Sequence, residues 1–155
     1  MKTILTYVIS ILVTELSGFA VGMLTRSGTQ AYAESITKPP LSPPGIVFPI
    51  AWTILYGLMG IGLARVLLAE SSEWRTRGII LYVVQLVLNL AWCFIFFSAK
   101  RYDLAFFELV IMFAAVVAMS ICFRKVDKPS QMMQIPYLCW LVFAGYLNSG
   151  VWFLQ

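Results

Sequence analysis

The chain has 155 residues, of which 61% are apolar and only 12% are charged, and its net charge is +4. A soluble globule of this size needs more polar residues to cover its surface, and the basic excess is too small and too scattered for nucleic-acid binding. The composition therefore indicates a single integral membrane domain over residues 1–155 and excludes a soluble, disordered or disulfide-stapled secreted protein.

Five apolar stretches are each long enough to cross a bilayer, which takes about 20 helical residues. Helices are favoured over barrel strands because the stretches are continuously apolar rather than alternating. We therefore expect an all-α membrane protein, a five-transmembrane-helix bundle with spans at 4–25, 45–69, 78–98, 103–123 and 131–154. Short polar connectors after the second, third and fourth spans predict antiparallel neighbours in a compact bundle.

The first connector, residues 26–44, is the longest. Its last part carries four prolines between positions 39 and 44, which remove backbone donors and predict a stiff, extended stretch. Such a Pro-rich loop has two readings, a lid over a pocket between helices or a rigid linker that starts the next helix, and both stay open at this point.

Basic residues predict the orientation of the bundle, because cytoplasmic connectors carry the excess of Lys and Arg. With five spans, the N-terminus shares its side with the second and fourth connectors. That side carries six basic residues against four on the other. We expect the N-terminus in the cytoplasm and the Pro-rich loop outside, in a multi-pass protein of a bacterial inner (cell) membrane.

Three spans each present one face of aromatic or amide side chains at helical spacing. Two faces are aromatic, and the third carries two amides that should face the bundle interior. Together they predict a flat, mostly apolar cavity suited to a planar conjugated ligand. The alternative is ordinary aromatic packing with interhelical hydrogen bonds. The faces comprise Phe48, Trp52 and Tyr56; Gln85, Asn89, Trp92 and Phe96; and Tyr137, Trp140, Ala144 and Asn148.

Two acidic residues lie within the spans. Glu15, in the first span, is a candidate proton-coupling residue of a small-molecule exporter, because ionisable groups inside a membrane tend to be functional. Glu108, in the fourth span, is expected to form a local salt bridge with Arg65 or Lys100 or to lie at a water-filled pocket mouth.

Conventional enzyme chemistry finds little support in the residues. There is no histidine, which excludes His-ligated metal sites and Ser-His or Cys-His catalysis. The sequence supplies no evident nucleophile, acid–base pair or metal cluster. We therefore expect no metal and no cofactor, and no catalytic residues are assigned.

Four segments, in order along the chain, resemble the translocator protein family, also called tryptophan-rich sensory proteins or peripheral benzodiazepine receptors. Tyr32-Ala33 with the Lys-Pro and Pro-Pro-Gly of 38–45 is similar to the family's first-loop motif. The Trp, Leu-Tyr and Met-Gly of 52–60 are similar to a WxxLYxxMG helix. Residues 88–97 are similar to LNxAWxxxFF, and 136–152 to PYLxWxxFAxxLNxxxW.

The resemblance implies a five-helix bundle, commonly a homodimer, that binds protoporphyrin IX-like porphyrins and similar planar apolar ligands. Tetrapyrrole transport, sensing or a stress response is the implied function, and Trp-dependent photochemical porphyrin degradation is the alternative. The matching motifs imply a ligand site made of Tyr32, Pro43, Trp52, Tyr56, Asn89, Trp92, Trp140 and Ala144, with Phe48 and Gln85 as further lining positions.

The chain departs from the family pattern in its first loop. Ala31 and Leu41 stand where the family usually has tryptophan. The loop therefore lacks two large aromatic side chains, and an altered porphyrin affinity is expected.

Overall fold

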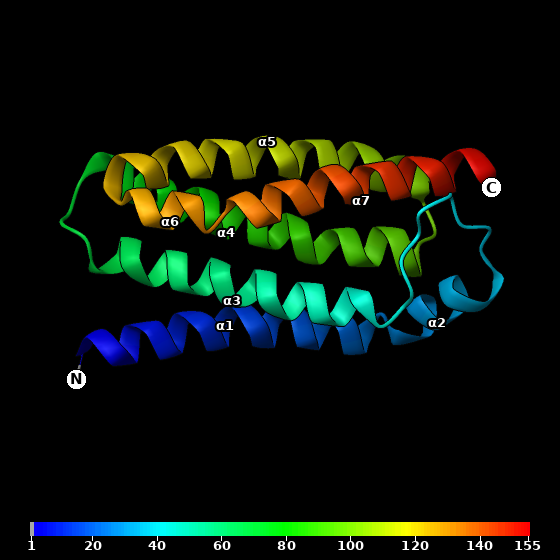
Figure 1. Cartoon of the computed structure of the whole chain (residues 1–155), viewed down its shortest axis with the longest axis horizontal. Coiled ribbons are helices and arrows are strands. Elements are labelled where there is room, and N and C mark those ends of the chain that lie inside the picture. The colour runs from blue at the N-terminus through cyan, green and yellow to red at the C-terminus, as the bar shows by residue number, and fades with distance from the viewer. Residues whose placement is uncertain (1) are drawn as a thin grey trace.

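Five long helices run along one axis in the computed structural model, which describes residues 2–155 (Figure 1). They are α1 (Lys2–Leu24), α3 (Val47–Leu68), α4 (Glu73–Cys93), α5 (Tyr102–Val126) and α7 (Ile135–Leu154). Each of the five spans is long and apolar enough to cross a membrane, with α4 extended by the π-helical turn η1 (Phe94–Ser98) and α7 preceded by the short helix α6 (Lys128–Met132). The predicted all-α, five-span membrane protein is confirmed.

The first connector is only partly extended. Residues Arg26–Ser35 form a further helix, α2, at the end of the bundle opposite the N-terminus. The prediction of a loop over 26–44 was wrong for this part, because its polar sequence has no apolar stripe from which a helix could be read. The remaining Pro-rich segment, residues 36–46, is not helical but is not extended throughout. It turns at Pro40–Leu41, where Leu41 has φ 64° and the amide of Ser42 donates to the carbonyl of Pro39, and it then leads into α3.

Helix α3 packs differently on its two sides. The backbones of α1 and α3 lie close together over much of their length, whereas those of α3 and α7 hardly approach each other. Gly60 permits the close side, because a Cβ at this position would lie 2.7 Å from the Cα of Ile11. Gly18 of α1 likewise lies directly against the ring of Tyr56. These small residues therefore serve contacts within the chain.

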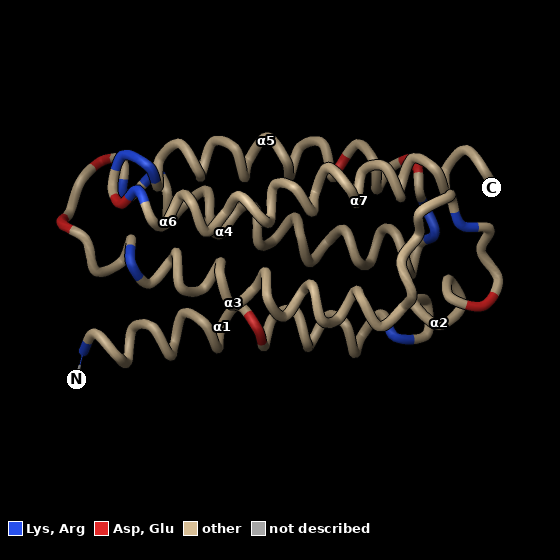
Figure 2. The backbone as a smooth tube through the Cα atoms, viewed as in Figure 1, with Lys and Arg blue, Asp and Glu red and all other residues tan. Residues whose placement is uncertain are grey.

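Most charged residues lie at the two ends of the bundle (Figure 2). At the end that holds the N-terminus, Arg65 makes a bidentate ion pair with Asp127, with nitrogen–oxygen distances of 2.7 and 2.9 Å. The hydrogen bonds from Arg65 lower the pKa of Asp127 to about 2. Arg75 also donates to the carbonyl oxygens of Val66 and Leu67 in the last turn of α3. This end of α3 is thus fixed by charge-assisted hydrogen bonds.

Candidate functional site

The polar side chains of α4 that the spacing assigned to one face lie inside the bundle. Gln85 is fully buried and Asn89 is 3% exposed, which confirms the prediction that they face the interior. Asn89 sits between two tyrosines of neighbouring helices: its Oδ1 accepts from the hydroxyl of Tyr56 at 2.5 Å, and its Nδ2 donates to the hydroxyl oxygen of Tyr137 at 3.0 Å. One amide therefore joins α3, α4 and α7.

Five rings fill the space between α3 and α7, and the hydroxyls of two of them bind this amide. We call them the aromatic seam: Phe48, Trp52, Tyr56, Tyr137 and Trp140. The ring of Trp52 is central, because its centroid lies 5.2 Å from that of Tyr56, 6.1 Å from Tyr137 and 6.2 Å from Trp140. Most of these pairs meet edge to face, which aromatic quadrupoles favour. The wide backbone spacing of α3 and α7 is thus filled by side chains that can change rotamer.

A second group of rings lies next to the aromatic seam, on the side of the Pro-rich segment. It comprises Tyr32, Trp92, Phe96 and Phe97, and we call it the capping cluster. Tyr32 of α2 meets the edges of both phenylalanines at 5.4 and 5.7 Å between centroids. The π-helical turn η1 supplies these two adjacent phenylalanines. The capping cluster is how α2 docks on the bundle.

The Pro-rich segment lies against α7. The hydroxyl of Tyr146 donates to the carbonyl oxygen of Pro40 at 2.8 Å, and the ring of Pro39 packs against Gly150 so closely that a Cβ there would collide with it. Lys38 donates back to the carbonyl of Ala33 and lies over the ring of Tyr32. The segment therefore crosses the end of the bundle and is fastened to α7 by few polar bonds.

The predicted ligand residues thus fall into two neighbouring groups rather than one. Phe48, Trp52, Tyr56, Asn89 and Trp140 come together at the aromatic seam, and Tyr32 and Trp92 lie in the capping cluster. Ala144 packs against the main core, Pro43 lies half-buried in the Pro-rich segment, and Gln85 is buried on the face that holds Asn89.

Two residues outside the predicted ligand set prove central to the site. Tyr137 is fully buried and holds Asn89, and Asn148 accepts from the indole nitrogen of Trp92 at 3.2 Å while donating to the carbonyl of Tyr102. Both residues lie on the aromatic face of the last span, and this position could have indicated that they belong to the ligand set.

Some buried polar side-chain atoms have no protein partner, which is energetically costly. Both side-chain polar atoms of Gln85 and both carboxylate oxygens of Glu108 are buried and unpaired. The prediction of a salt bridge for Glu108 was wrong for both Arg65 and Lys100, because the Glu108 carboxylate has no partner and Arg65 pairs with Asp127 instead. Within residues 2–155, no group of three or more His, Cys, Asp or Glu is placed to hold a metal ion.

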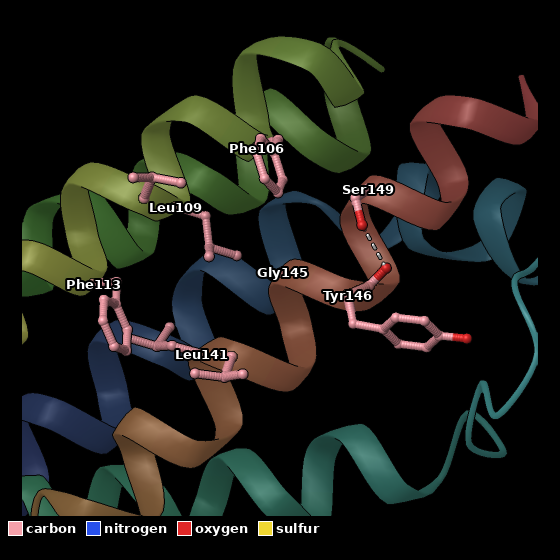
Figure 3. A pocket seen from close by; sticks show the side chains of 9 residues that line it. Phe106, Leu109, Phe113, Leu141, Gly145, Tyr146 and Ser149 are labelled. Carbon is pink, nitrogen blue, oxygen red and sulfur yellow. Dashed lines mark hydrogen bonds between the residues drawn. The ribbon is translucent and has the colours of Figure 1, made fainter.

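Two apolar hollows lie on the outer faces of the bundle. One, of about 310 Å³, runs between α5 and α7, and Figure 3 shows Phe106, Leu109 and Phe113 of α5 facing Leu141 and Gly145 of α7. The other, of about 460 Å³, lies between α3 and α7 with Trp140 in its wall, beside Ile54 and Phe143. The second hollow therefore adjoins the aromatic seam from the lipid side.

These features define a class: an integral, multi-pass membrane protein with a cluster of aromatic side chains inside a five-helix bundle. The TspO/MBR family model matches residues 10–153. The chain belongs to this family.

Curated relatives agree along nearly the whole chain. "Tryptophan-rich protein TspO" of Chlorobaculum tepidum is 35% identical over 97% of this chain and 96% of its own length. "Protein CrtK" of Rhodobacter capsulatus is 39% identical over 81% and 79% of the two chains, and the "Translocator protein" of Bos taurus is 31% identical over 91% and 85%. The resemblance drawn from the sequence motifs is therefore confirmed.

Proposed function

We propose that this protein binds a porphyrin of the protoporphyrin IX type, or a similar planar apolar ligand, between α3, α4 and α7, in the service of tetrapyrrole transport or sensing. The observation that carries the proposal is the aromatic seam, where rings from two helices converge on the amide of Asn89 from a third. A flat conjugated guest gains most from such rings, because stacking on them replaces contacts that the rings now make with each other.

Entry of a guest requires Trp52 and Trp140 to separate. Their ring centroids are 6.2 Å apart and the planes are nearly perpendicular, so a macrocycle would have to displace one ring. The hollow between α3 and α7 lies directly behind Trp140, and it offers that ring a place to turn into. The bilayer, in which porphyrins partition, lies on the same side.

The test is a titration of the purified full chain in detergent with protoporphyrin IX, followed by quenching of tryptophan fluorescence. We expect Trp52→Phe and Trp140→Phe each to weaken binding about tenfold, a loss of about 1.4 kcal/mol, which is in the range of a buried aromatic contact. Trp74→Phe is the matched control, because Trp74 is 40% exposed and lies at the opposite end of the bundle, in the first turn of α4. Unchanged affinity in both site variants would refute the proposal.

A second candidate is light-dependent breakdown of the porphyrin. The observation that favours it is that two indoles lie in ring contact with each other, so an excited porphyrin between them would have oxidisable groups on both sides. Illumination of the complex should then give a new absorbing product with the unmodified chain and none with the double variant Trp52→Phe, Trp140→Phe. The same product from both proteins would remove this candidate.

The membrane and the oligomer are part of the proposal as well. The end with more basic residues, which includes Arg75, Arg124 and Lys125, is assigned to the cytoplasm of a bacterial inner membrane, together with the N-terminus. A homodimer is proposed from the family resemblance. Labelling of single cysteines introduced at Glu34 and Glu70 with an impermeant reagent tests the orientation: we expect the first to react in intact cells and the second only after lysis.

A further inference from the structure

Glu108 is an acidic residue inside the membrane bundle whose carboxylate is buried and has no protein partner. It lies in α5, is 8% exposed, and neither of its carboxylate oxygens accepts or donates a hydrogen bond. The ion pairs found within residues 2–155 use other acids: Asp127 with Arg65, Glu73 with Arg77 and Asp103 with Arg101. A buried group of this kind calls for an explanation, because burial without a partner is costly.

The packing of α4 against α5 places Glu108 beside the proposed ligand site. The two helices are antiparallel, since Phe96 packs with Ala105 at one end and Gly78 lies against Phe123 at the other. This register sets Glu108 opposite Cys93, one turn beyond Asn89.

Contacts between α5 and α7 close the compartment from the other side. On one side of Glu108, Met112 lies under the hydroxyl of Tyr137, at the level of Asn89. On the other side, the carbonyl of Tyr102 accepts from Asn148, which also accepts from Trp92. The carboxyl of Glu108 therefore lies between two layers of hydrogen bonds that both belong to the site.

By this register and the contact of Tyr137 with Met112, the titratable groups next to Glu108 are the thiol of Cys93 from α4 and the phenol of Tyr137 from α7. Neither carries a positive charge. A carboxylate at this depth without a counter-charge is unfavourable, so the carboxyl is stable as the neutral acid or beside a ligand that supplies a donor.

We propose that Glu108 is a proton-binding site within the ligand compartment, so that an anionic porphyrin binds together with a proton on Glu108. The inference rests on the proposed function for its ligand. The propionate groups of such a porphyrin would repel an ionised Glu108 and leave a protonated one undisturbed. By linkage, a ligand that favours the protonated form binds more tightly where that form prevails.

The experiment compares protoporphyrin IX with its uncharged dimethyl ester, using the full chain in detergent between about pH 6 and about pH 9, where ordinary porphyrin carboxylates are already ionised. We expect the affinity for protoporphyrin IX to fall at least about fivefold as the pH rises, which is the lower range of coupling between two sites, and the affinity for the ester to stay constant. Glu108→Gln, which mimics the neutral acid, should bind tightly throughout, and Glu108→Asp should restore the pH dependence. Glu15→Gln is the matched control, because it removes the other intramembrane acid.

A measurement without ligand tests the proton site by itself. The infrared difference spectrum between high and low pH should show the carbonyl stretch of a protonated carboxylic acid in the unmodified chain and lose it in Glu108→Gln. Retention of that band in Glu108→Gln overturns the proton site, whatever the porphyrin does. Equal pH dependence in Glu108→Gln and the unmodified chain overturns the coupling. A failure of any porphyrin to bind overturns the proposed function and the coupling, and the infrared band then decides on the proton site alone.

Discussion

Helix α3 packs against its two neighbours, α1 and α7, in opposite ways. Towards α1, glycines bring the backbones together, as Gly60 does against Ile11. Towards α7, the backbones stay apart and the large rings of Trp52 and Trp140 fill the gap. Where glycine lets two backbones touch, the contact contains no side chain that can change rotamer. Aromatic side chains, in contrast, can change rotamer and so contact different residues. The first side therefore acts as a fixed support, and the second as a site that can reorganise.

The largest effect is expected from adding a side chain where α3 contacts α1. We expect Gly60→Ala to destabilise the bundle by about 1–3 kcal/mol, because its Cβ would meet the backbone of Ile11, which cannot move aside. Gly57→Ala on the same helix is the control. Its Cβ would lie 3.6 Å from a carboxylate oxygen of Glu15, an ordinary contact, so we expect no loss and a gain of up to about 1 kcal/mol from helix propensity.

Thermal unfolding of both variants in detergent, followed by circular dichroism, measures this difference. Equal midpoints for Gly60→Ala and Gly57→Ala would mean that α1 and α3 can slide apart, and that the support is not fixed.

A smaller effect on stability is expected from replacing Asn89, the amide that binds the two tyrosines of the aromatic seam. Asn89→Leu leaves the hydroxyls of Tyr56 and Tyr137 without this partner, and we expect a loss of about 1–2 kcal/mol, the upper range for hydrogen bonds between membrane helices. Gln85→Leu is the control one turn away. Because both polar atoms of Gln85 are unpaired, its replacement should be neutral or stabilising in the ligand-free protein.

Unfolding in a denaturing detergent, with the two leucine variants in parallel, gives the comparison. A loss for Gln85→Leu as large as that for Asn89→Leu would show that Gln85 has a partner in solution.

The smallest effect concerns the ion pair that anchors α3 next to α6. The pKa of Asp127 is lowered to about 2 by Arg65, so its stabilisation is present above the ordinary range near pH 4 and is lost as the pH falls towards 2. The pair is partly exposed, with 34% of the Arg65 side chain and 21% of the Asp127 side chain accessible. We therefore expect only about 1 kcal/mol from it.

Asp127→Asn tests that pair while keeping an oxygen that can accept from the amide of Ser130. Its stability should change less than that of the unmodified chain between about pH 4 and about pH 2. Parallel stability curves for the two proteins would show that the ion pair contributes nothing to the fold.

The sequence predicted what periodicity encodes. Continuous apolar stretches predicted the five spans, and spacings of three and four predicted that Asn89 and Gln85 turn inward. Helix α2 escaped prediction because its residues are polar and it docks through Tyr32 and Gly28, whose contacts on Phe96 and Phe97 lie more than 60 positions later. The partner of Arg65 escaped it too, because the choice between two acids depends on how α5 and α6 turn at Asp127.

One local irregularity has a wider consequence. At Phe94–Ser98 the chain is wound with a hydrogen bond from the amide of Ala99 to the carbonyl of Phe94, five residues back. Within this turn, the two consecutive rings of Phe96 and Phe97 both contact Tyr32. A one-residue deletion here would restore regular winding and rotate everything downstream, so insertions and deletions in this stretch should be tolerated far less than in the polar connector at 70–72.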